Sequence, residues 1–96
     1  MREEVTDRYG NVIYLTDERW QHIVERHPEL AKYRAEVLSS IRLGDRRRSP
    51  YYPDSFHYRK TFRHFKGWFK KIEVIVAFHW QIDKPNNFVV TAYPQP

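Results

Sequence analysis

The chain has 96 residues, which is enough for one small domain with a single hydrophobic core. Hydrophobic residues make up 41% of the sequence and the net charge is +5, so the composition excludes a disordered chain and favours a folded basic protein. Because the sequence contains no cysteine, disulfide scaffolds, thiol catalysis and zinc sites with thiolate ligands are also excluded.

The first elements in chain order are a hairpin and a helix. Two short apolar segments flank a turn that contains Gly10 and Asn11, which predicts a hairpin over residues 3–15. Thr16 is a good helix cap because its hydroxyl can accept a hydrogen bond from a free backbone N–H, and two acidic residues follow it. Apolar residues then recur with helical spacing, so a helix is expected over residues 17–27.

A second helix is expected directly after the first. Pro28 either ends the first helix or opens the second. An apolar stripe continues to Ile41, and Gly44 stands just beyond it, as is typical of the end of a helix. The pattern predicts a helix over residues 28–41 that packs with the first helix as a unit.

The second half of the chain changes from helical spacing to an alternation with period two, which is typical of strands. The most apolar of these segments is expected at the centre of the sheet. Turns are predicted where glycine, proline and asparagine interrupt the alternation. The strands are expected over residues 56–65, 72–80 and 88–93, with turns at residues 66–68 and 83–87.

Together these elements predict a single domain, residues 1–96, of the α+β class. Two N-terminal helices pack on one face of an antiparallel sheet of three to five strands, and the other face is free. The alternation places an unusually reactive set of side chains on that free face. These residues are Arg59, Thr61, Arg63, Glu73, His79, Thr91 and Tyr93.

Basic and aromatic residues are concentrated together between Arg42 and Lys71. This segment contains ten basic and two acidic residues, a net charge of +8, with aromatic residues interleaved. Basic groups bind phosphates and flat rings stack on unpaired bases, which favours single-stranded RNA or DNA as a partner. The alternative is a solvated pair of strands whose aromatic residues form core. The residues expected to bind the nucleic acid are Arg46, Arg47, Arg48, Tyr58, Lys60, Lys66 and His79.

Some of these side chains suit metal-independent cleavage of RNA. That reaction removes a proton from the 2′-hydroxyl, stabilises charge on the phosphorane and protonates the leaving 5′-oxygen. Arg59 and Arg63 project to the same side and could hold a phosphate, although both could equally be solvated surface residues. Thr91 and Tyr93 also point together and could orient the phosphate or the attacking oxygen, unless Tyr93 belongs to the edge of the core.

Two histidines on the first helix are candidates for the proton transfers, because histidine titrates near neutral pH. His22 and His27 are five residues apart, about 140° around a helix, so they cannot bind one metal ion together. No metal or other cofactor is expected. His22 could instead be an ordinary surface residue, and His27 a hydrogen-bonded residue at the end of the helix.

Residues Ile13–Ile23 (IYLTDERWQHI) and Glu25–Leu30 (ERHPEL) resemble the opening of a family of small phage-associated and bacterial toxin-like nucleases. These nucleases are grouped with the barnase/EndoU/colicin/RelE (BECR) fold. The resemblance extends more loosely to Glu73–Val76 and Val90–Tyr93. It implies a BECR/RelE-like fold and metal-independent endoribonuclease activity. The site residues that it implies are His22 or His27, Arg59 or Lys60 or Arg63, and Thr91 with Tyr93.

The leading hypothesis is therefore an endoribonuclease, the toxin of a toxin–antitoxin or phage-related system, with RNA as substrate and an acidic antitoxin as partner. A non-catalytic module that binds RNA or single-stranded nucleic acid is the alternative. A component that only binds another protein is a third, disfavoured because neither helix has a spare apolar face. The sequence contains no apolar run that could span a membrane and no N-terminal signal peptide, so we expect a cytoplasmic protein without a membrane partner.

Overall fold

The computed structural model describes all 96 residues and contains two α-helices, one short 3-10 helix and six strands. The α+β class is confirmed, but the sheet has more strands than the three to five expected. Its order is β1-β2-β6-β5-β4-β3, and all neighbours are antiparallel except β2 and β6. The elements are β1 (Arg2–Thr6), β2 (Val12–Thr16), α1 (Asp17–Arg26), η1 (Pro28–Leu30), α2 (Arg34–Leu43), β3 (Asp45–Arg48), β4 (Ser55–Thr61), β5 (Lys71–Gln81) and β6 (Lys84–Gln95).

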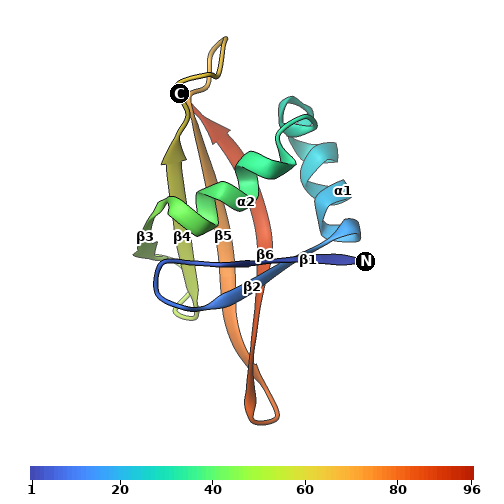
Figure 1. Cartoon of the computed structure of the whole chain (residues 1–96), viewed down its shortest axis with the longest axis vertical. Coiled ribbons are helices and arrows are strands. Elements are labelled where there is room, and N and C mark those ends of the chain that lie inside the picture. The colour runs from blue at the N-terminus through green and yellow to red at the C-terminus, as the bar shows by residue number, and fades with distance from the viewer.

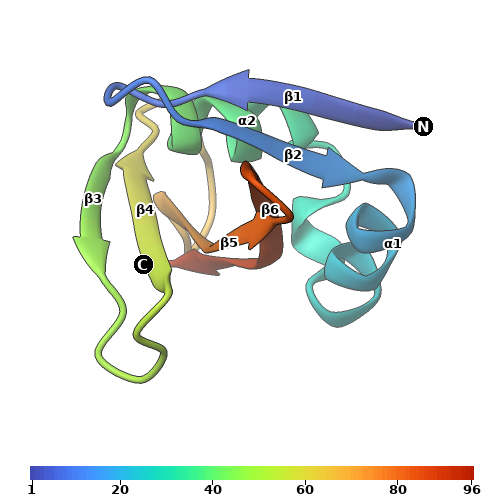
Figure 2. The same cartoon turned by 90° about the horizontal axis from the view of Figure 1, so that it is seen from below.

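One face of the sheet is covered and the other is open. Helix α2 crosses β4 and β5, and the β1–β2 hairpin lies on the same side of these strands (Figure 1). Figure 2 shows no helix on the side of β4 and β5 opposite to α2, and we call that side the open face. The buried apolar side chains of the core are Ile13, Leu15, Ile23, Leu30, Val37, Ile41, Tyr58, Phe62, Phe65, Phe69, Ile72, Val74, Val76, Val89 and Ala92.

Helix α1 lies beside β6, where it takes the place of a neighbouring strand (Figure 1). Strand β2 pairs with β6 only at Asn87 and Phe88, so the rest of this edge of β6 has no strand next to it. The helix begins as predicted, because the backbone N–H of Arg19 donates to Thr16 Oγ1 over 3.0 Å. Its one fully buried residue, Ile23, joins the core.

The second helix is not continuous from residue 28 to residue 41 as predicted. Residues Pro28–Leu30 form one turn of 3-10 helix, and α2 begins only at Arg34. The break lets Leu30 enter the core and places the Tyr33 ring 4.6 Å from that of Phe65. The break thus lets both Leu30 and Tyr33 bury apolar surface in the core, which favours two short helices over one long one.

The strands also differ from the prediction at their ends. Residues Asp45–Arg48 form an edge strand that the sequence did not predict, because its charged side chains show no apolar alternation. Strand β4 ends at Thr61, and the segment after it turns back to bury Phe62 and Phe65.

The last hairpin turns earlier than predicted. Ile82 has a φ of 62° at the turn, and Pro85 already pairs with Trp80. The predicted turn residues Asn86 and Asn87 lie inside β6, where their side chains hydrogen-bond to β2. Neither α1 nor α2 has the length and apolar character needed to cross a membrane.

Candidate functional site

Four strands bring polar side chains together in the middle of the open face. In the strand register, Arg47 on β3 lies opposite His57 on β4. Glu73 on β5 lies opposite both Arg59 on β4 and Tyr93 on β6. Because side chains alternate along a strand, all five project to the same side of the sheet. We call these five residues the open-face cluster.

Glu73 is the centre of the open-face cluster. Its Oε2 atom lies 2.7 Å from His57 Nδ1, and it accepts a hydrogen bond of 2.8 Å from the Tyr93 hydroxyl. An Arg47 guanidinium nitrogen lies 3.9 Å from the same oxygen. An ionised carboxylate only accepts hydrogen bonds, so His57 Nδ1 carries a hydrogen and donates it to Glu73.

The histidine and the carboxylate are buried although they lie on the open face. The side chains of His57 and Glu73 are 7% and 2% exposed, whereas that of Arg47 is 62% exposed. His57 Nε2 and Glu73 Oε1 have no hydrogen-bond partner in the protein. Buried polar atoms are nearly always paired, so each of these two atoms calls for an explanation beyond packing.

A small hollow of about 50 Å³ adjoins the pair. Its walls come from β3, β4 and β5, and no apolar side chain lines it. Arg47 and Arg59 beside it are exposed, so the hollow combines a buried histidine–carboxylate pair with exposed positive charge. The residues around it are Asp45, Arg46, Arg47, His57, Arg59 and Glu73.

The surroundings keep Glu73 ionised and Tyr93 protonated. Burial raises the pKa of Glu73, but the hydrogen bonds from His57 and Tyr93 and the nearby Arg47 together bring it below its ordinary value. Burial and the hydrogen bond to Glu73 raise the pKa of Tyr93 to about 12. The carboxylate is therefore a weak base, suited to holding the imidazole in place through Nδ1.

The structure brings some of the predicted catalytic residues to this cluster. Arg59 and Tyr93 belong to it. The ring of His27, at the end of α1, lies 6.3 Å from the Tyr93 ring between centroids. Tyr93 is therefore in contact with α1 on one side and with Glu73 on the other.

Other predicted catalytic residues are not part of the cluster. His22 and Thr91 line a separate hollow between α1 and β6, together with Arg19 and Arg26. Arg63 is exposed in the segment after β4. The structure thus places His22 and Thr91 together. Thr91 lies opposite Ile75, which is two residues from Glu73 on the same face of β5.

Two residues predicted to bind nucleic acid lie toward the covered face. Tyr58 is fully buried in the core and its hydroxyl donates to Asp7, so it is not accessible to a ligand. The Arg46 guanidinium stacks 4.0 Å above the Tyr9 ring and lies 3.6 Å from the Asp7 carboxylate. The alternation that places Arg47 on the open face turns its neighbours to the other side.

The remaining predicted ligand contacts are spread over the surface. Arg48 donates to the carbonyl of Pro53, and Lys66 is exposed in the segment before β5. Lys60 Nζ lies 4.5 Å above the Phe62 ring. His79 Nε2 lies 2.6 Å from an Asp54 carboxylate oxygen, in an exposed pair.

The sequence analysis placed Glu73 on the free face but gave it no role, and it gave none to His57. One signal was present. Glu73 is the only acidic residue between Asp54 and Asp83, and it interrupts the apolar run from Ile72 to Phe78. A lone carboxylate at such a position needs a partner from another strand. The strand register sets Arg59 opposite Glu73, and the hydrogen-bond partner is His57, two residues before Arg59 on the same face of β4.

Comparisons with known proteins add no relative. No family model, no curated protein and no solved structure matches the chain. The structure also contains no group of three or more histidine and acidic side chains arranged to hold a metal ion.

Proposed function

We propose that this protein is a metal-independent endoribonuclease whose reaction centre is the open-face cluster. The observation that carries the proposal is the buried His57–Glu73 pair, in which each partner keeps one unpaired polar atom beside exposed arginines. Buried polar atoms in pairs needed only for stability are nearly always hydrogen-bonded, because an unpaired buried group costs about 1–3 kcal/mol.

In the proposed reaction, His57 Nε2 accepts the proton of the 2′-hydroxyl while the bond from the 2′-oxygen to phosphorus forms. Glu73 holds the resulting imidazolium and stabilises its charge. Arg47 and Arg59 neutralise the charge that develops on the non-bridging oxygens. The bond to the 5′-oxygen then breaks, and the imidazolium returns its proton to that oxygen. The products are a 2′,3′-cyclic phosphate and a 5′-hydroxyl.

The wider surface supports single-stranded RNA as the substrate. Arg19 and Arg26 line the hollow between α1 and β6, beyond Tyr93. Tyr51 and Tyr52, in the loop between β3 and β4, are 79% and 59% exposed and could stack on bases. The resemblance of residues 13–30 to toxin-like nucleases supports the same activity. We extend the proposal on that basis to a BECR-type toxin that an acidic antitoxin silences.

The proposal is tested by incubating the protein with a single-stranded RNA and with the DNA of the same sequence, both in EDTA. We expect RNA fragments that end in 2′,3′-cyclic phosphate and intact DNA. If a folded protein binds the RNA without cutting it, the enzyme proposal is wrong and the non-catalytic binding module takes its place.

A further inference from the structure

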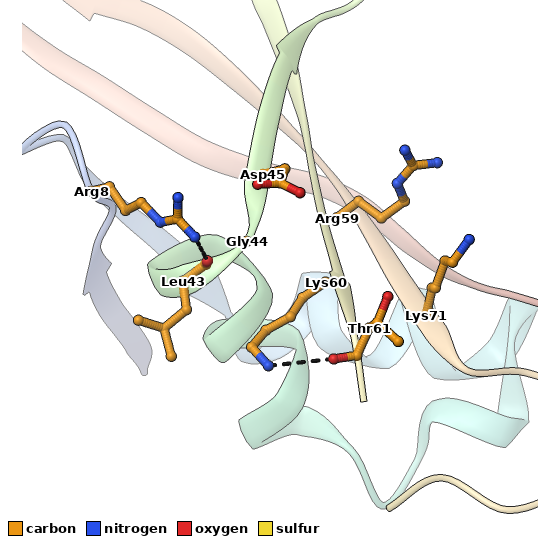
Figure 3. A pocket seen from close by; sticks show the side chains of 8 residues that line it. All are labelled: Arg8, Leu43, Gly44, Asp45, Arg59, Lys60, Thr61 and Lys71. Carbon is orange, nitrogen blue, oxygen red and sulfur yellow. Dashed lines mark hydrogen bonds between the residues drawn. The ribbon is translucent and has the colours of Figure 1, made fainter. Parts of the chain in front are cut away.

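A second and larger hollow adjoins the open-face cluster, and Arg59 lines both. It has a volume of about 440 Å³ and lies where the turn after α2 meets the end of β4 and the start of β5 (Figure 3). Leu43 is its one apolar residue. The complete lining is Arg8, Leu43, Gly44, Asp45, Arg59, Lys60, Thr61 and Lys71.

The composition of this hollow fits an anion and does not fit a nucleobase. Four of the eight lining residues are cationic and one, Asp45, is acidic. A base buries its faces against apolar or aromatic surface, which a single leucine does not provide. A phosphate needs concentrated positive charge and hydrogen-bond donors, which the hollow has.

The four cationic side chains differ in whether they form hydrogen bonds or ion pairs within the protein. Arg8 donates to the carbonyl oxygen of Leu43, at the end of α2. Lys60 Nζ makes a long contact of 3.4 Å with the Thr61 carbonyl. Neither Arg59 nor Lys71 forms an ion pair or a side-chain hydrogen bond, and their side chains extend to the same side in Figure 3. These two cations are available to a ligand.

The distance from the reaction centre matches one step along a nucleic acid. Lys71 stands two residues before Glu73 on β5, on the same face, which is a separation of about 6.6 Å along the strand. This is comparable to the separation of successive phosphates in an extended single strand. Arg59, opposite Glu73, lies between the two positions.

Gly44 fixes the wall of this hollow. A Cβ atom at Gly44 would clash with the backbone carbonyl oxygens of Ser40 and Arg59, so only glycine lets the turn after α2 lie against β4. Backbone packing therefore fixes that side of the hollow, and side chains form the rest of its lining.

We propose that this hollow is a subsite for a second phosphate of the RNA strand, adjacent to the phosphate at the His57–Glu73 pair. The inference rests on the proposed function for the identity of the ligand. It adds that the substrate is bound through two successive phosphates, with Arg59 shared between them and Lys71 specific to the second.

The test uses three 2′-deoxy dinucleotides, which cannot be cleaved: one without a terminal phosphate, one with a 5′-phosphate and one with a 3′-phosphate. We expect one of the two terminal phosphates to strengthen binding roughly five- to tenfold, as for a charge-assisted contact. Which of the two phosphorylated dinucleotides binds more tightly shows in which direction the RNA strand runs across the protein. In Lys71→Gln this gain is lost, whereas in Lys84→Gln, at the opposite end of the β5–β6 hairpin, it remains.

Equal affinities for all three dinucleotides, or a gain that persists in Lys71→Gln, would overturn the subsite. Because these ligands are not cleaved, the result is separate from that of the proposed function. A phosphate-dependent gain in affinity without RNA cleavage would support the subsite and reject the nuclease proposal. RNA cleavage without that gain would support the nuclease proposal and reject the subsite.

Discussion

The two faces of the sheet each bury a carboxylate that accepts a hydrogen bond from a tyrosine and faces an arginine. On the covered face this carboxylate is Asp7, with Tyr58 and Arg46. On the open face it is Glu73, with Tyr93 and Arg47, and here His57 is added. A carboxylate, a tyrosine and an arginine are common to both groups. A comparison of the two groups therefore shows which features belong to the open face alone.

The difference lies in the atoms left unpaired. Asp7 accepts from the backbone N–H groups of Tyr9 and Asn11, from the Asn11 side chain and from Tyr58, so both of its oxygens are satisfied. Glu73 uses only Oε2, and its Oε1 and the His57 Nε2 stay unpaired. We interpret the satisfied group as a device that fixes the β1–β2 turn to the core, and the unsatisfied group as a site of chemistry.

The largest expected effect is on RNA cleavage. Glu73→Gln and His57→Gln each remove one member of the pair, and we expect each to lower the cleavage rate roughly 10²–10⁴-fold. Because the two residues act as a unit, the double variant should lose no more than the stronger single variant. Rates are measured at equal concentrations of folded protein. Losses that multiply in the double variant would show that the two residues act independently.

The next effect is on stability, and it belongs to the covered face. Asp7→Ala leaves the Tyr58 hydroxyl and the Arg46 guanidinium without their acceptor, and we expect the free energy of unfolding to fall by about 3 kcal/mol. Urea denaturation measures this loss. The cleavage rate of each folded molecule should stay within about twofold, and a rate loss as large as that of Glu73→Gln would contradict the division between the faces.

The two tyrosines sharpen the comparison with one matched substitution. Tyr58→Phe should lower the free energy of unfolding by about 1 kcal/mol and leave cleavage unchanged. Tyr93→Phe should destabilise less, since Tyr93 is half-buried, but it should slow cleavage about tenfold because Glu73 loses a donor. The same pattern for both variants would argue that neither face is specialised.

The smallest and most gradual effect is that of pH on stability. Burial raises the pKa of Asp7 and Glu73, but hydrogen bonds outweigh it and bring both pKa values below their ordinary range. The stability that these groups contribute is therefore present above about pH 4 and is lost as the pH falls through their lower folded pKa values. The pKa of Tyr93 is raised to about 12, so its contribution is present below about pH 10 and is lost as the pH rises toward 12.

Stability should therefore be highest between these limits. Denaturation curves at a series of pH values check this expectation for the wild type. Glu73→Gln should weaken the acid dependence, and Tyr93→Phe should weaken the alkaline one. Unchanged pH profiles in both variants would show that the hydrogen bonds at Glu73 do not shift the pKa values of Glu73 and Tyr93.

The sequence predicted the elements that local chemistry determines. Thr16 and the acidic residues after it fixed the start of α1, and the apolar alternation located β5. It did not predict β3, whose charged residues show no apolar alternation, or the pairing of β2 with β6, which depends on the whole sheet. Part of the site followed from the alternation, which placed Glu73 and Tyr93 on one face. The role of His57 could not follow, because it depends on a partner from another strand.

The most direct test of the account is to locate the nucleic acid on the protein. A single-stranded 2′-deoxy oligonucleotide is added to the isotope-labelled protein, and changes in the NMR shifts of backbone amides and histidine rings are followed. The account predicts changes at Arg47, His57, Arg59 and Glu73 on the open face, and none at Asp7 on the covered face. Changes confined to the covered face, or to the hollow between α1 and β6, would contradict it.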